Sequence, residues 1–164
     1  MYPRTIRDFI GFVDGVGYAG IILEAKLPEL KLLIANHRAG GMDAPAPQDM
    51  GMEAMQAEIT SAEWTEELVT LVGTRKRLVL RPGAKGQQDF VADSYIATIG
   101  GLWSATKFAD LKPGSDVPLT LSLEVDYFRL EKDGKVLVEI DVEAYKRIIN
   151  GVDQLASIRQ AMGR

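Results

Sequence analysis

Six residues near the N-terminus, GVGYAG at positions 15–20, match the G-x-G-x-x-G pattern of loops that bind dinucleotides. Such a loop follows a strand and opens a helix, whose N-terminus receives the pyrophosphate, and an acidic residue about 20 positions later binds the ribose. Here YAGIIL favours a strand, and the position that should be acidic falls within LLIANHR. The dipeptide Asp14–Gly15 is typical of a hairpin turn. The motif therefore favours a turn, and a nucleotide-dependent enzyme is the weaker hypothesis, which titration with NAD, NADP or FAD would test.

Three carboxylates alternate near the C-terminus, at Glu139, Asp141 and Glu143. On an extended strand they would share one face, roughly 6.5 Å apart at successive positions. They can bind Ca²⁺ or transfer protons, but calcium sites usually take their oxygen ligands from a curved loop. The spacing favours a solvated sheet face over a metal site, and an acidic wall facing a water-filled channel is a third interpretation.

The amino-acid composition excludes several other kinds of site. The 164 residues include no cysteine and one histidine, His37, which excludes disulfides, thiolate zinc sites, cysteine nucleophiles and multi-histidine metal sites. The net charge of −4 argues against a protein that binds nucleic acid through its phosphates. No apolar run approaches the ~20 residues of a membrane-spanning helix, and the first residues do not resemble a signal peptide. We expect a protein made and kept in a cytoplasm, with no cofactor and no membrane partner.

The pattern along the chain predicts a mainly β fold in one domain. Alternating and β-branched runs around two Asp–Gly turns indicate antiparallel strands. Thr60 and Glu63 have the spacing of a capping box and predict a helix over residues 60–73. A second short helix, capped by Asp153, ends the chain. Residues 39–52 predict a long loop, whose methionines provide either a docking surface or local gap filling.

The strongest pattern is an amphipathic ribbon over residues 118–149. Its first arm is predicted to place Leu119, Leu121, Leu123, Val125 and Tyr127 on one face. A long ribbon with open edges invites pairing with another chain. Either another part of the domain or another subunit must cover it, and closure into a barrel across subunits would remove every edge.

The C-terminal stretch DGKVLVEID, followed by NGVDQL and IRQAMG, resembles the major tail tube proteins of contractile-tailed bacteriophages and the related R-type pyocins. The segments HRAGGMDAPAPQDMGM and FVDGVGYAGIILEAKLPEL resemble the loop and the N-terminal hairpin of the same family. The resemblance implies a single tail-tube domain over residues 1–164, an antiparallel β-sandwich with one flanking helix. It also implies hexameric rings whose inner sheets join into one barrel, and a structural, non-enzymatic role as the inner tube of a contractile tail.

The resemblance gives two groups of residues a role. Candidates for the lumen of the tube are Thr120, Ser122, Glu124, Asp126, Glu139, Asp141 and Glu143. Candidates for contacts between subunits or rings are Arg38, Gly40, Gly41, Met42, Pro45, Pro47, Asp49, Met50 and Met52. An acidic lumen would let DNA slide past without specific binding, because basic patches are absent from it.

The implied partners are further copies of the chain, a tail sheath protein, a tape-measure protein, a baseplate hub and a tail terminator. The implied location is the virion, after assembly in the cytoplasm of the host bacterium. The alternative function is a monomeric β-sandwich that binds a small ligand on apolar strand faces near Trp64 and Trp103.

Overall fold

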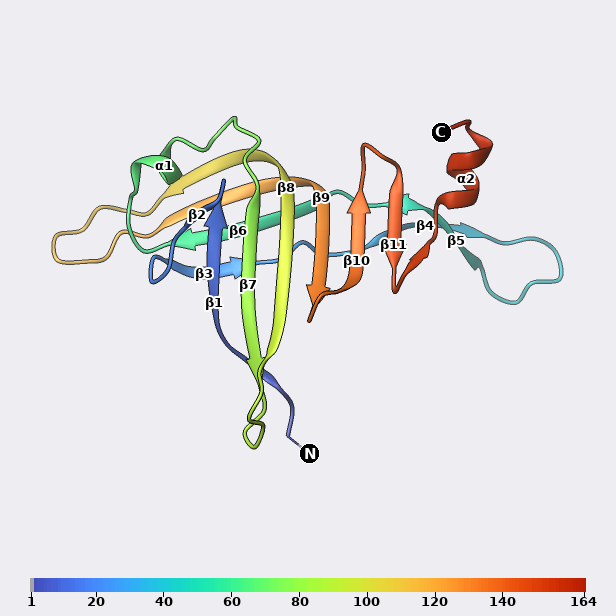
Figure 1. Cartoon of the computed structure of the whole chain (residues 1–164). Helices are drawn as coiled ribbons and strands as arrows, with labels where there is room; N and C mark the ends of the chain where they lie inside the picture. Colours follow the sequence, from blue (N-terminus) through green and yellow to red (C-terminus); the bar gives the residue numbers. More distant parts are fainter. Residues whose placement is uncertain (1) are drawn as a thin grey trace.

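The computed structural model describes residues 2–164, which form a mainly β structure with antiparallel strands (Figure 1). The strands within these residues are β1 (Thr5–Val13), β2 (Val16–Gly17), β3 (Ile22–Lys26), β4 (Leu32–His37), β5 (Ala46–Met52), β6 (Met55–Ser61), β7 (Leu78–Lys85), β8 (Asp93–Phe108), β9 (Leu119–Lys132), β10 (Lys135–Asp141), β11 (Lys146–Ile149) and β12 (Val152–Asp153). The helices are α1 (Glu66–Val69) and α2 (Ala156–Ala161). The predicted mainly β, antiparallel fold is confirmed.

Two long strands, β8 and β9, run through both layers of a sandwich. One layer, the broad sheet, has the order β12-β11-β10-β9-β8-β7-β1-β2. The other, the four-stranded sheet, joins β3, β6, residues 119–125 of β9 and residues 101–108 of β8. In Figure 1, β1, β7 and β10 run vertically, whereas β3 and β6 run across them. The chain passes from one sheet to the other at Gly100 and Gly101, where the register between β8 and β9 shifts.

The inner faces of the two sheets share one core. In the four-stranded sheet, Leu119, Leu121 and Leu123 are fully buried, which stabilises the fold by roughly 1.5–3 kcal/mol for each side chain. They pack with Leu78 and Ile99 of the broad sheet in a single cluster. The predicted period of two along the first arm of the ribbon is therefore confirmed as far as Val125.

Beyond Val125 the predicted alternation is wrong by one residue. Gly101 lies opposite Val125 while Gly100 lies opposite Tyr127, so Asp126 is an extra residue in β9. Because side chains alternate with a period of two, one extra residue moves every later side chain to the other face. Phe128 rather than Tyr127 is therefore buried.

The glycine motif forms a turn. Asp14 and Gly15 have φ of 51° and 79° and connect β1 to β2. Asp133 and Gly134 do the same between β9 and β10, with φ of 48° and 82°. Two successive residues at positive φ are the signature of the hairpin turn that suits twisted strands. No helix follows GVGYAG, so the arrangement that a dinucleotide needs is absent from the described chain around this motif.

The helix predicted over residues 60–73 is much shorter in the structure. Strand β6 continues through Ser61, Thr60 lies opposite Thr120, and only Glu66–Val69 are helical. Pairing of β6 with β9 buries Ala57, Ile59 and Ser61, and this long-range pairing outweighs the local capping signal. The C-terminal helix is confirmed, but it begins after Leu155, and Asp153 lies in β12, where it accepts a hydrogen bond from the Leu155 N–H.

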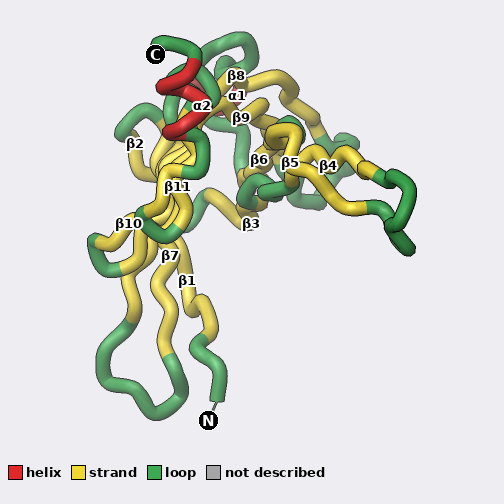
Figure 2. The backbone as a smooth tube through the Cα atoms, turned by 90° about the vertical axis from the view of Figure 1, so that its right-hand side faces the viewer, coloured by secondary structure: helices red, strands yellow, loops and turns green. Residues whose placement is uncertain are grey.

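The long loop predicted at residues 39–52 is half strand. Residues 46–52 form β5, which pairs with β4, so that the connecting loop covers only residues 38–45. This hairpin is a separate two-stranded sheet, here called the arm. Figure 2 shows the arm projecting from one side of the molecule, away from β1 and β7. Pro45 lies in the connecting loop, whereas Pro47 lies in β5, where proline is tolerated because both strands of the arm are edges.

The predicted ribbon at residues 118–149 differs in its second half. Strand β10 ends at Asp141, a turn follows, and residues 146–149 form β11, which folds back on β10. The ribbon is also covered within its own chain, because β9 pairs with β8, β10 and β6. The edges that remain open lie elsewhere in the molecule.

Candidate assembly surfaces

The outward face of the four-stranded sheet is mostly polar. The side chains that alternate with the buried ones are Glu24, Lys26, Gln56, Glu58, Thr60, Leu102, Ala105, Lys107, Thr120, Ser122 and Glu124. At its centre, Gln56 Nε2 donates a hydrogen bond of 2.9 Å to Glu124 Oε1, and Ser104 Oγ donates one of 3.3 Å to the same oxygen. The face carries hydroxyls, amides, carboxylates and two lysines, but no arginine.

Both edges of this sheet are open. Among the described residues, β3 pairs with β6 alone, and residues 104–108 of β8 pair with β9 alone. Trp103, just before this segment, still bonds to Gly73 and Thr74 through its backbone. Each open edge is thus five residues long. Unpaired strand edges are templates for pairing with another chain.

The predicted lumen residues do not share one surface. Thr120, Ser122 and Glu124 lie on the outward face of the four-stranded sheet. Glu139 and Asp141 lie on the outward face of the broad sheet. The two groups therefore face away from each other, on opposite sides of the sandwich.

The two remaining lumen candidates lie outside regular pairing. Asp126 is the bulge residue, and its Oδ2 pairs with Arg75 Nη1 at 2.6 Å. Glu143 lies in the turn after β10, so that Glu139, Asp141 and Glu143 are not three neighbours on one strand. Asp141 accepts a hydrogen bond from the Ala144 N–H, which stabilises this turn. Within residues 2–164 no group of three or more His, Cys, Asp or Glu side chains is placed to hold a metal ion.

An ion pair ties the arm to the C-terminal part of the broad sheet. The side chain of Arg147 in β11 is 5% exposed, and its Nη2 pairs with Asp49 of β5. Its Nε donates a hydrogen bond of 2.9 Å to Gln154 Oε1. Asp49 Oδ1 also accepts a hydrogen bond of 2.9 Å from the Gly51 N–H. A buried guanidinium needs such partners, since an unpaired buried charge is strongly destabilising.

The same contacts set the protonation of Asp49. The Gly51 N–H and then Arg147 hold the pKa of the Asp49 carboxyl below its usual range. A carboxyl with a lowered pKa in the folded state stabilises that state above the unfolded pKa, and the contribution is lost as the pH falls through the folded value. The contact between the arm and β11 therefore contributes in full at neutral pH.

Other predicted contact residues are distributed along the arm. Arg38, Gly40, Gly41, Met42 and Pro45 lie in its connecting loop, whereas Pro47, Asp49, Met50 and Met52 lie on β5. Met50 is 62% exposed and Ile34 on the neighbouring strand is 51% exposed. Met52 packs against the core, so it and Asp49 make contacts within the chain. Isolated two-stranded hairpins are marginally stable in water, and the exposed apolar side chains of the arm leave it incompletely covered.

Replacing Arg147 with methionine is expected to release the arm while leaving the sandwich folded. Because Asp49 loses its partner, amide exchange in β4 and β5 should become roughly tenfold faster, and exchange in β7 and β8 should not change. Hydrogen–deuterium exchange with mass spectrometry measures both. Arg75→Met, which breaks the exposed pair with Asp126, is the matched control and should leave the arm unchanged. Equal exchange in the two variants would show that Arg147 does not hold the arm.

The sequence alone does not reveal the role of Arg147 or which strand edges are open. Arg147 lies opposite Ile140 on the core side of the broad sheet. Its position could be recognised only after β11 was known to fold back on β10. The edge of β3 carries ordinary strand residues, and nothing in their types distinguishes an open edge from a paired one.

Comparison with known proteins identifies the family. The family described as phage tail tube protein FII matches residues 3–163. The tail tube protein of Escherichia phage P2 is 29% identical over 172 positions, with 98% of each chain covered. The major tail tube protein of Serratia phage KSP20 is 26% identical over 143 positions, covering 85% of this chain and 84% of that protein.

Solved structures agree on the fold. A sheath/tube terminator of the extracellular contractile injection system PVC superposes with a TM-score of 0.62 at 7% identity, covering 80% of this chain and 98% of that one. A chain of the PVC sheath–tube complex superposes with a TM-score of 0.61 at 8% identity, covering 79% and 92%. The family is structural, so the prediction that the chain is not an enzyme is confirmed, and a ligand-binding role gains no support from these relatives. With nearly all of its residues matched, the chain belongs to the phage tail tube protein FII family, whose members are structural components of the virion.

Proposed function

We propose that identical copies join edge to edge, β3 of one copy beside the free part of β8 of the next, so that the four-stranded sheets of a ring close into a barrel. The two open edges of matching length are the observation that carries this proposal. The four strands alternate in direction, so β3 and β8 run opposite ways. Copies related by rotation would therefore pair in the antiparallel manner of the rest of the sheet, and closure would leave no edge in that barrel.

The outward face of the four-stranded sheet would then line the channel. Thr120, Ser122 and Glu124 are the proposed lumen residues, and Glu139 and Asp141 lie on the outer wall. The distribution of charge supports the assignment of this face, rather than the outward face of the broad sheet, to the channel. The broad sheet presents Arg77 and Arg81 on its outward face, over the rings of Tyr127 and Phe12 at 5.1 and 5.6 Å.

The channel side, in contrast, carries no arginine, and its carboxylates Glu24, Glu58 and Glu124 outnumber its two lysines. Affinity for DNA comes mainly from cations that neutralise phosphates. A channel with this face would let DNA slide without retaining it.

The rings are proposed to be hexameric and to stack into a tube, as the family resemblance implies. The exposed loop and apolar side chains of the arm would contact neighbouring copies in the ring or in the next ring. A PVC structure of similar fold is a sheath–tube complex, and we propose that this tube likewise lies inside a contractile sheath. The tape-measure protein, baseplate hub and terminator are the further partners, with assembly in the host cytoplasm.

Electron cryomicroscopy of the concentrated protein, or of native particles, tests the proposal. We expect a hollow tube of stacked rings in which β3 and β8 of adjacent copies are paired and Glu124 faces the channel. A tube with Glu139 facing the channel would reverse the assignment of the two sheets. A protein that stays monomeric at every concentration, alone and in lysate, would contradict assembly itself.

A further inference from the structure

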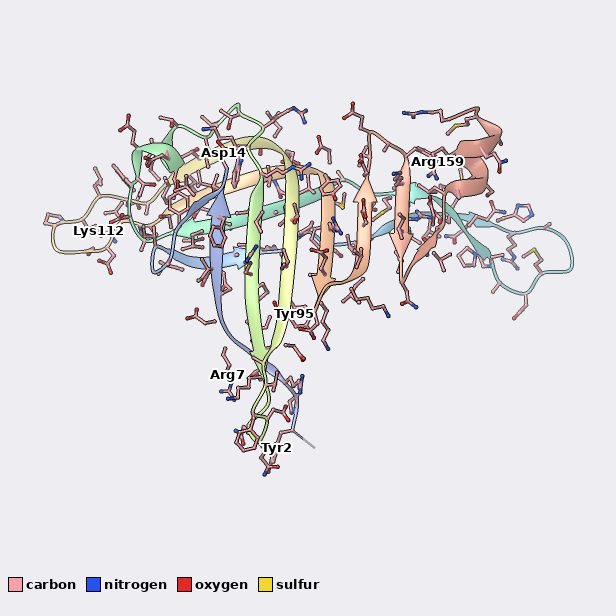
Figure 3. The ribbon with its side chains drawn as sticks, in the orientation of Figure 1. Tyr2, Arg7, Asp14, Tyr95, Lys112 and Arg159 are labelled. Atoms are coloured by element: carbon pink, nitrogen blue, oxygen red, sulfur yellow. The ribbon has the colours of Figure 1, made fainter. Side chains whose placement is uncertain are left out.

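The loop between β7 and β8, residues 86–92, presents an apolar tip that nothing in its own chain covers. Phe90 is 99% exposed and Val91 is 75% exposed. The base of the loop is held in place, because Arg4 Nε pairs with Asp89 at 3.0 Å and Arg4 also pairs with Asp93. In Figure 3 this loop lies at the lower tip of the molecule beside Tyr2. A large apolar side chain on an anchored loop is typical of an interface anchor.

An apolar hollow of matching character lies at a different end of the molecule. Trp64, Leu111 and Val117 line an open depression of about 280 Å³. Phe108 braces one wall, since its ring meets that of Trp64 edge to face with centroids 5.0 Å apart. An open depression with apolar walls suits an apolar side chain that comes from outside its own chain.

The two features cannot meet within one copy. Figure 3 places Lys112, in the loop that carries Leu111, at the left-hand end of the molecule and Tyr2 at its lower tip. A contact between unlike surfaces of identical chains is heterologous, and its repetition generates rings or filaments. This geometry suits an occupant that is another copy of this chain.

Charge around the two features is complementary. Glu63, Glu66 and Glu67 lie within three residues of Trp64 in the chain, and none of them forms an ion pair within residues 2–164. Asp110 and Lys112, which flank Leu111, offset each other in charge, so that the hollow keeps an excess of carboxylates. Near the Phe90 loop, Arg7 and Lys85 are likewise without an ion-pair partner in the described chain, and Lys85 lies opposite Thr5 at the start of β1. Opposite charges around an apolar anchor fix the orientation of docking.

We propose that Phe90 of one copy inserts into the hollow formed by Trp64, Leu111 and Val117 of another copy. This inference rests on the proposed assembly of identical chains. It adds to the pairing of β3 with β8 a second contact between copies, made by side chains rather than by backbone.

Disulfide cross-linking tests the contact, because the chain has no cysteine of its own. Phe90→Cys and Leu111→Cys are prepared as separate proteins, mixed under assembly conditions and treated with a mild oxidant. We expect a disulfide-linked dimer in the mixture and only traces of dimer in either protein alone. Val142→Cys mixed with Leu111→Cys is the matched control, since Val142 is 59% exposed on another part of the surface.

Each result separates this inference from the proposed function when the same samples are viewed by electron microscopy. Dimers specific to the Phe90–Leu111 mixture support the contact, whether or not tubes are seen. Tubes without such dimers would overturn the contact and leave ring assembly standing, with the Phe90 loop free for a different protein. Neither dimers nor tubes would overturn both.

Discussion

Replacing Gly101 with alanine is expected to destroy the native fold. At this residue β8 leaves one sheet and enters the other, and β9 crosses directly against it. A Cβ atom there would collide with the carbonyl oxygen of Glu124, lie 2.9 Å from its carbonyl carbon and 3.0 Å from the Cα of Val125. All three atoms belong to the backbone of β9, which is paired on both sides.

The clash cannot be relieved by a change of rotamer. Overpacking costs about 1–3 kcal/mol even where side chains can move. Here a paired strand must shift, so we expect a loss of more than about 3 kcal/mol from a domain whose total stability is on the order of 5–15 kcal/mol. The variant should be insoluble, or should unfold at a much lower urea concentration when followed by circular dichroism.

Gly83→Ala is the control for this prediction. Gly83 lies in β7 of the broad sheet, and a Cβ atom added to it would meet nothing within 4 Å. Its substitution should change the unfolding midpoint little. If Gly101→Ala were as stable as Gly83→Ala, the close approach of β8 and β9 at this residue would be disproved.

Trp103→Ala is expected to lower the free energy of unfolding by a large fraction of its total value. Trp103 is 1% exposed and lies in the core cluster where the two sheets meet. Its indole Nε1 donates a hydrogen bond of 2.9 Å to the Lys76 carbonyl oxygen. Its backbone N–H and C=O bond to Thr74 and Gly73 at 3.0 and 2.8 Å. The side chain therefore fills the core and fixes the segment between α1 and β7.

Removing a buried tryptophan side chain costs about 3–5 kcal/mol, because the cavity left behind is only partly refilled. Trp103→Phe keeps most of the apolar contact but leaves the Lys76 carbonyl without its donor, which costs about 1–3 kcal/mol. The urea concentration at the midpoint of unfolding should therefore be highest for the wild type, lower for Trp103→Phe and lowest for Trp103→Ala.

Trp64→Ala provides the matched comparison, since Trp64 is 45% exposed. It should unfold close to the wild-type midpoint, whereas its place in the hollow predicts weaker assembly. If Trp64→Ala were as destabilised as Trp103→Ala, Trp64 would belong to the core, and the hollow could not be a free surface.

Local patterns were sufficient for the elements whose residues determine their own conformation. The Asp–Gly turns at residues 14–15 and 133–134 were recognised because few residues adopt positive φ. The buried face of residues 119–125 was recognised because a half-buried strand repeats every two residues. The resemblance to the family likewise rests on short C-terminal motifs, which are local in the sequence.

The errors occurred where a distant segment decided the outcome. Thr60 has the local signature of a helix start, yet it is a strand residue because β9 lies beside it. The bulge at Asp126 is imposed by the crossing at Gly101 and exchanges the roles of Tyr127 and Phe128. The sequence predicts a loop at residues 46–52 because their partners in β4 are nine or more residues away in the chain.

The amino-acid order thus establishes a non-enzymatic, mainly β protein of the tail tube family, because turn chemistry, alternation and motifs are local properties. It could not establish which edges are open, which polar face belongs to which sheet, or that Arg147 binds Asp49. Those properties depend on pairings between residues far apart in the chain, and one register shift moves a whole row of side chains to the opposite face. The division of the acidic residues between the two sides of the sandwich is therefore a property of the folded molecule alone.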